Sequence, residues 1–246
     1  MKYGWKPDPY DCNDLHFHVS APVAVPPKYS LVSKMPRAYD QLSIGSCTSN
    51  AIAGLVEYLE IKLKRPQYTP SRLFIYFYER YLEGTINEDS GAAIRDGMKV
   101  VATNGAPHEN LWPYIVGNFR TTPPITCYKD GIKHRVHEYS RVTQSLNKMK
   151  ECIAADFPFV FGFRVFSSFE SLVVTLTGIV PMPGPFEREV GGHAVVACGY
   201  DDDTQMFDVR NSWGENWGLH GYCKMPYAYL TNPQLTSDLW TAHLVV

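Results

Sequence analysis

The hydrophobic positions in the first half of the chain recur with the period of an α-helix. The clearest pattern predicts a helix of about four turns from Thr48 that ends before Pro66; its apolar positions are Ile52, Leu55, Val56, Leu59 and Leu63. A second helix is predicted from Pro70 to about Glu83, with Thr69 as its cap. The first half is therefore expected to be mainly helical.

The pattern changes in the second half. A third helix is predicted from about residue 93 to 103 and a short one near residues 145–155. Later runs are short, aromatic or β-branched, and bounded by turns, which is typical of antiparallel strands; they are FPFVFGFRVF, AVVACGY, MFDVRN and GYCKM. Helices followed by strands predict an α+β fold whose two halves pack on each other with a cleft between them.

Residues 1–28 differ from both halves. They contain five prolines and little periodicity, so we predict an extended arm that is held by contacts with the rest of the chain. Four aromatic side chains of the arm would need burial somewhere; they are Tyr3, Trp5, Tyr10 and Phe17.

Composition and charge exclude some functions. The formal net charge is -2 over 246 residues, with no run of like charges, so a nucleic acid or an anionic membrane is not an expected partner. No signal peptide or membrane-spanning run is recognisable, which leaves the cytoplasm and a signal-free export route both open. The six cysteines form no CxxC pair, and no cofactor or metal is predicted; Cys12, His16 and His18 on the arm are judged incidental. We expect a monomer.

Cys47 stands at the predicted start of the first long helix, in the stretch QLSIGSCTSNAIA. Unpaired N–H groups and the positive end of the helix dipole stabilise a thiolate there. Gly45 and Ser46 let the chain turn into this position, and Ser46 can cap the first turn. An isolated cysteine before a helix is usually inert, so a second catalytic group is needed.

His193 and Asn211 supply candidates for that second group. His193 follows two glycines at the start of an apolar strand, and Asn211 lies 18 residues later (211 - 193), at the end of the next strand. Antiparallel pairing would set the two side by side, so that the amide oxygen accepts from one imidazole nitrogen and the other faces the thiol. Trp213 and Trp217 could shield that hydrogen bond from water.

Together these motifs resemble the papain family of cysteine peptidases over nearly all of residues 30–246. Cys47 matches the nucleophile, His193 in GGHAVVACGY the base and Asn211 in RNSWGENWGLHGY the third member, while Gln41 matches the glutamine that binds the oxyanion. The 146 residues between cysteine and histidine (193 - 47) lie within the spacing of such enzymes, about 130–150.

The resemblance implies a fold, a reaction and a substrate. The fold is papain-like and two-lobed: a helical lobe at about residues 41–130 and an antiparallel, β-barrel-like lobe at about 131–246, both within a peptidase domain of residues 29–246. The reaction is hydrolysis of peptide bonds in a polypeptide by a Cys–His–Asn mechanism. Substrate would contact a rim made by Ser90, Gly91 and Ala92 in EDSGAAIRDG, together with Gly192 and Trp213.

Departures from the family pattern raise further expectations. The position three residues before the nucleophile, usually a disulfide-forming cysteine, is Ile44. The arm is also much shorter than the usual inhibitory prosegment, and we expect it to lie along the cleft and partly block it. Two rival functions stay open: another acyl transfer or a deamidation on the same machinery, and a binding protein of the same fold that lacks catalysis.

Overall fold

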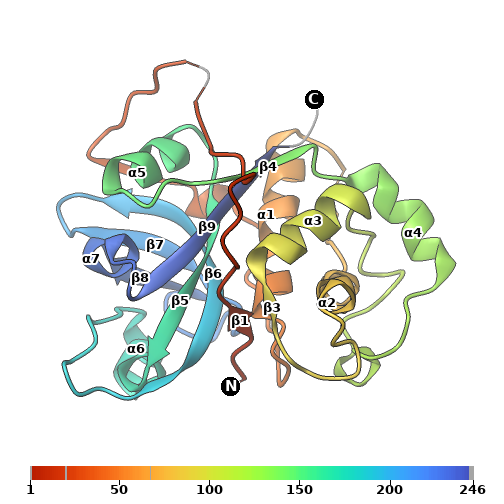
Figure 1. Cartoon of the computed structure of the whole chain (residues 1–246). Helices are drawn as coiled ribbons and strands as arrows, with labels where there is room; N and C mark the ends of the chain where they lie inside the picture. The colour runs from red at the N-terminus through yellow and green to blue at the C-terminus, as the bar shows by residue number, and fades with distance from the viewer. Residues whose placement is uncertain (1, 20, 67, 244–246) are drawn as a thin grey trace.

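The computed structural model describes residues 2–19, 21–66 and 68–243. It has a helical side and a sheet side, with the N-terminal arm running between them (Figure 1). The helices are α1 (Cys47–Lys62), α2 (Arg72–Leu82), α3 (Ile94–Thr103), α4 (Ile125–Gly131), α5 (Leu146–Ala154), α6 (Leu172–Thr177) and α7 (Tyr227–Thr231), with 3₁₀ turns η1 (Val32–Lys34), η2 (Val116–Asn118), η3 (Ile132–His134) and η4 (Ser167–Glu170). The long predicted helices are thus confirmed.

The strands form one large sheet and one small one. The large sheet is antiparallel in the order β4 (Glu138–Arg141), β9 (Thr236–His243), β5 (Phe159–Phe166), β6 (Glu189–Asp201), β7 (Met206–Arg210) and β8 (Tyr222–Pro226), with β2 (Lys28–Ser30) paired to β6. The small sheet joins β1 (Trp5–Lys6) to β3 (Ala92–Ala93) in parallel. The α+β class and the antiparallel lobe are confirmed, but the large sheet stays open and does not close into a barrel.

Helix α1 is the centre of the molecule. Every residue from Cys47 to Glu60 is buried, because the helix packs on β6 on one side and on α2 and α3 on the other. Such a helix is apolar around most of its circumference. Its N-terminus, with Cys47, is thereby fixed where the helical side meets the sheet.

Two predicted caps differ from the structure. Helix α2 begins at Arg72, and the Ser71 hydroxyl accepts from the N–H of Phe74, so Ser71 is the cap in place of Thr69. At the start of α1 the Ser46 side chain makes no capping bond. Its hydroxyl instead lies 2.5 Å from the Tyr114 hydroxyl, so the group that could cap the helix is engaged in a tertiary hydrogen bond.

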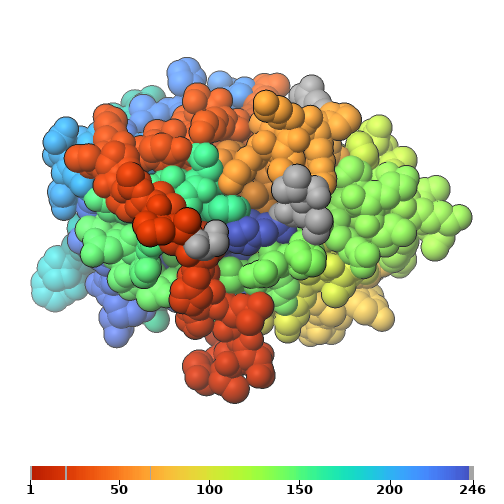
Figure 2. Space-filling view, turned by 90° about the horizontal axis from the view of Figure 1, so that it is seen from above, coloured from red at the N-terminus to blue at the C-terminus, as the bar shows by residue number. Residues whose placement is uncertain are grey.

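The arm is held by contacts along its length. Trp5 and Phe17 are buried, and Tyr3 is partly buried, whereas Tyr10 is 92% exposed, so the expectation that all four rings are covered is wrong for Tyr10. Seen from above, much of the arm lies on the outside of the molecule (Figure 2). Within the described ranges, every helix is too short or too polar to cross a bilayer.

Candidate active site

His193 and Asn211 are brought together by adjacent strands. β6 and β7 are antiparallel with Val196 opposite Arg210, and the Nε2 atom of His193 lies 2.7 Å from Oδ1 of Asn211. That oxygen also accepts from the Ser212 N–H at 2.8 Å, which fixes the orientation of the amide. An amide oxygen can only accept, so Nε2 carries the proton and Nδ1 is the basic atom of the neutral ring.

The imidazole of His193 is enclosed by aromatic rings. Trp213 lies 5.2 Å from it between ring centroids, and Trp217 packs on Trp213 at the same distance. His193 lies inside β6, which starts earlier than predicted, at Glu189. Its Nδ1 atom is buried and has no hydrogen-bond partner among the described residues.

The sulfur of Cys47 faces the backbone beside this imidazole. Backbone N–H groups of Ala194, Gly4 and Thr48 contact the sulfur. Thr48 belongs to the first turn of α1 and Ala194 directly follows His193, so the helix tip and the strand meet here. Burial raises the pKa of Cys47 to about 11, although these N–H groups oppose the shift.

Gln41 precedes Cys47 in the turn that leads into α1, and its side chain is buried. Its side-chain oxygen accepts from the Ser212 hydroxyl at 2.7 Å, so its Nε2 is left as a donor. That nitrogen lies 3.1 Å from the carbonyl oxygen of Ile44 and 3.1 Å from that of Lys2. The predicted oxyanion donor therefore binds a peptide carbonyl of the arm.

The predicted substrate rim contacts the arm at four of its five residues. The Ala92 N–H donates to the Gly4 carbonyl at 2.7 Å, and a Cβ on Gly91 would overlap that same carbonyl. Trp5 fills the space beside Gly192, and the ring of Tyr3 lies 6.3 Å from that of Trp213. The hydroxyl of the fifth residue, Ser90, is hydrogen-bonded to the Thr85 hydroxyl and donates to the Gly91 carbonyl. Ser90 therefore stabilises the backbone of the rim.

Sequence reasoning missed one buried acid close to this site. Glu79 of α2 accepts from the Thr48 hydroxyl at 2.9 Å, and its other oxygen is buried without a partner among the described residues. Burial raises the pKa of Glu79 well above its ordinary value. The residue lies within an aromatic stripe, LFIYFYERY, and nothing in that pattern signals that its side chain turns inward to α1.

The cysteine and histidine residues of the arm do not assemble a metal site. Cys12, His16 and His18 are all exposed, and the group of potential ligands that does assemble in the described part of the chain is His108, Asp130 and His134. These three come from segments that local patterns do not bring together. All six cysteines are free, which agrees with the missing cysteine at Ile44.

Known proteins share both the sequence and the fold. The model of the papain family cysteine protease matches residues 34–238. An uncharacterized peptidase C1-like protein of Acanthamoeba polyphaga mimivirus is 45% identical over 210 residues, which is 82% of this chain and 68% of that protein. A probable cysteine protease of Arabidopsis thaliana is 30% identical over 200 residues, covering 76% of this chain and 40% of the relative.

Solved structures extend the likeness to the whole chain. Xylellain, a cysteine protease from Xylella fastidiosa, superimposes with a TM-score of 0.92 at 41% identity, covering 99% of this chain and 96% of the other. Procathepsin L 3 of Tenebrio molitor has a TM-score of 0.75 at 16% identity, with 94% and 75% covered, and shares the fold. The chain belongs to the papain family of cysteine proteases.

Proposed function

We propose that this protease hydrolyses peptide bonds with Cys47 as nucleophile, His193 as base and Asn211 as the residue that orients the imidazole. The observation that carries the proposal is the 2.7 Å bond between His193 Nε2 and Asn211 Oδ1, because it leaves Nδ1 as the proton acceptor. The sulfur contacts the backbone N–H of Ala194, the residue that follows His193, so the helix tip that carries the thiol meets the strand that carries the base.

The proposed reaction follows from these positions. The Cys47 thiol first gives its proton to Nδ1 of His193, and the resulting thiolate attacks the carbonyl carbon, so that negative charge develops on the carbonyl oxygen. The Gln41 side chain and the Cys47 backbone N–H donate to that oxygen. His193 then protonates the leaving amine, and a thioester forms on Cys47. Water, deprotonated by His193, hydrolyses the thioester and restores the thiol.

We also propose that the arm inhibits this reaction. The Lys2 carbonyl accepts from the Gln41 amide, the donor that the oxyanion needs, and the Tyr3 ring lies 6.0 Å from that of His193. The Gly4 N–H faces the sulfur. An N–H group is not an electrophile, so the docked arm occupies the site without presenting a carbonyl carbon for attack.

The docked arm also opposes formation of the reactive ion pair. Burial lowers the pKa of His193 to about 4, against the opposing effect of its bond to Asn211, while burial raises the pKa of Cys47 to about 11. Both groups are therefore neutral at neutral pH with the arm in place. Displacing the arm admits water and favours the thiolate–imidazolium form, which is the attacking species.

A labelling experiment tests the proposed nucleophile. We expect a thiol alkylating reagent to modify Cys47 and to end hydrolysis of short peptide amides in parallel, with the adduct mapped by mass spectrometry. Cys12 is exposed and serves as an internal control, because its modification should leave turnover unchanged. Turnover that persists after complete modification of Cys47 would contradict the proposal, and transfer of an acyl group without hydrolysis would favour the rival reaction.

Docking of the arm is expected to depend on pH through Asp8. Burial and the neighbouring Asp238 raise the pKa of Asp8 from 3.8 to about 6. Hydrogen bonds from the Arg95 N–H and the Trp240 side chain, together with the charge of Arg141, lower it but do not cancel the rise. A carboxyl whose pKa is higher in the docked state binds a proton on docking, so this contribution is fully present below about pH 4 and is lost as the pH rises through 6.

The arm of the parent chain should therefore resist proteolysis better at pH 4.5 than at pH 7.5. In Asp8→Asn the difference between the two pH values should shrink, because the amide does not titrate. The measurement is the rate of arm cleavage by a protease active at both pH values, corrected for its own pH dependence on an unfolded peptide. Equal pH dependence in parent and variant would show that another group controls docking.

A further inference from the structure

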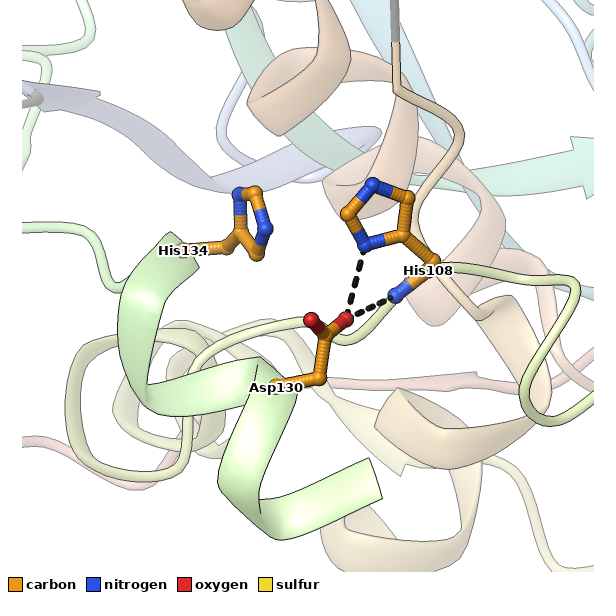
Figure 3. A group of neighbouring side chains, drawn as sticks. All are labelled: His108, Asp130 and His134. Carbon is orange, nitrogen blue, oxygen red and sulfur yellow. Dashed lines mark hydrogen bonds and ion pairs between the residues drawn. The ribbon is translucent and has the colours of Figure 1, made fainter. Parts of the chain in front are cut away.

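A second group of chemically active side chains lies on the helical side, away from Cys47. His108, Asp130 and His134 have potential ligand atoms within 4.8 Å of one another. The two imidazole rings lie on the same side of the Asp130 carboxylate, as Figure 3 shows, with centroids 4.9 Å apart and planes at 80°. His108 comes from the loop after α3, and the other two from α4 and η3 at the outer edge of the helical side (Figure 1).

Backbone contacts hold these segments together. Gly105 has a positive φ, and a Cβ on it would overlap the carbonyl oxygen of Gly131, so the loop approaches the end of α4 closely. One Asp130 carboxylate oxygen then accepts from the backbone N–H of His108 at 2.9 Å, and the ring Nδ1 of His108 lies 2.7 Å from the same oxygen. The three side chains are therefore positioned by the fold.

We propose that His108, Asp130 and His134 bind a divalent transition-metal ion, with Zn²⁺ the best match. Two imidazoles and one carboxylate are ligands that Zn²⁺ prefers, and water completes a four-coordinate site. Bonds of about 2.0–2.1 Å place tetrahedral ligands about 3.4 Å apart. Because the ligand atoms all lie within 4.8 Å of one another, no pair has to close by more than about 1.4 Å when the ion binds.

The surroundings of the cluster match such a site. Glu60 lies 3.4 Å from Nδ1 of His134, and a carboxylate behind a ligating histidine orients the ring and leaves Nε2 for the metal. Tyr68 stacks on His134 at 4.2 Å between centroids and fixes the plane of the ring. Side-chain exposures of 38% for His108 and 19% for His134 leave the cluster open to an incoming ion. Lys133, 3.7 Å from Asp130, is 69% exposed and can move away.

A bound ion would tie the loop that carries His108 to α4 and η3. The next residue, Glu109, pairs with Arg72 at 2.7 Å. That guanidinium in turn donates to the Asp40 carbonyl at 3.1 Å, directly before Gln41. The metal would thus stabilise the support of the oxyanion donor without contacting substrate.

Zinc titration of the untagged 246-residue chain tests the site. The Cys47→Ala background removes zinc binding by the catalytic thiol. We expect one equivalent of Zn²⁺ to bind, by calorimetry and by metal analysis after dialysis, and the melting temperature to rise. Asp130→Asn and His134→Gln should each weaken binding at least tenfold, and the control His137→Gln, an exposed histidine nearby, should not.

Histidine modification provides a second measurement on the same background without changing the cluster. Zn²⁺ should protect His108 and His134 from diethyl pyrocarbonate and leave the exposed His16 and His137 reactive, as judged by mass spectrometry. No binding at 100 µM Zn²⁺, equal affinity in all three variants, or modification of His108 and His134 that zinc does not slow would each overturn the proposal.

Discussion

Cys47→Ala is expected to abolish peptide hydrolysis, with a loss of at least about 10⁴-fold in kcat, because no other group at the tip of α1 can form the thioester. The fold should persist. The side chain is fully buried, but removing one sulfur atom from a packed site leaves only a small cavity, with a cost of about 1 kcal/mol in the free energy of unfolding. Circular dichroism and the melting temperature check the fold, and a fluorogenic peptide amide measures kcat.

Cys12→Ala is the matched control, since it removes an exposed thiol outside the site. It should retain full activity. Asn211→Ala should show a smaller loss than Cys47→Ala, because the imidazole would lose its orientation and the base would remain. If the Cys47→Ala protein, purified free of contaminating protease, still hydrolyses the substrate, the nucleophile is a different residue.

The main elements were predictable because their signals are local. The apolar period after Thr48 requires a helix, and the alternation of turns and β-branched runs requires short strands. The pairing of His193 with Asn211 was predictable as well, because the two strands are consecutive and the turn between them sets their register. In each case the residues that interact are close to one another in the sequence.

The features that depend on distant partners were not predictable in the same way. Ser46 could cap α1 from local chemistry, but its hydroxyl bonds to Tyr114, far along the chain. The inward turn of Glu79 depends on Thr48 of another helix. The cluster of His108 and Asp130 depends on the contact between Gly105 and Gly131, which links the loop after α3 to the end of α4, two segments with no shared periodicity. Tertiary packing decides each of these, and periodicity carries no information about it.

The arm prediction shows the same limit. Its proline content predicts an extended segment, and its aromatic rings predict burial, yet neither determines which rings are covered. Trp5 is buried because glycines at Gly162 and Gly192 leave room for an indole in the wall of the sheet. Tyr10, in contrast, remains exposed. The position of the covering surface is thus set by small residues elsewhere in the chain.

Gly4→Val is expected to raise kcat/KM for a short peptide amide at least tenfold. Gly4 passes so close to Gly45 and Gly91 that a Cβ on it would overlap the Gly45 carbonyl oxygen, a backbone atom that cannot move aside. The larger side chain should therefore expel the first residues of the arm from the site. Trp5, Phe17 and β2 hold the rest of the arm, so the core stays covered.

Tyr10→Ala is the control, because its ring is 92% exposed and its loss should leave the arm docked. Displacement can be measured independently of activity. The Ala92 N–H donates to the Gly4 carbonyl, so its hydrogen exchange should accelerate in Gly4→Val and not in the control. Alkylation of Cys47 should also begin at lower pH in Gly4→Val, since burial, the cause of its raised pKa, is relieved.

These measurements separate inhibition from mere occupancy. If Ala92 exchanges faster in Gly4→Val while kcat/KM and the alkylation profile match those of the parent chain, the arm lies over the site without limiting the reaction. If all three change together, the Lys2 carbonyl on Gln41 and the Gly4 N–H at the sulfur are the contacts that a substrate must displace. Competition for the same donors then sets the activity of the intact chain, because a carbonyl oxygen of the substrate cannot reach Gln41 until the arm leaves it.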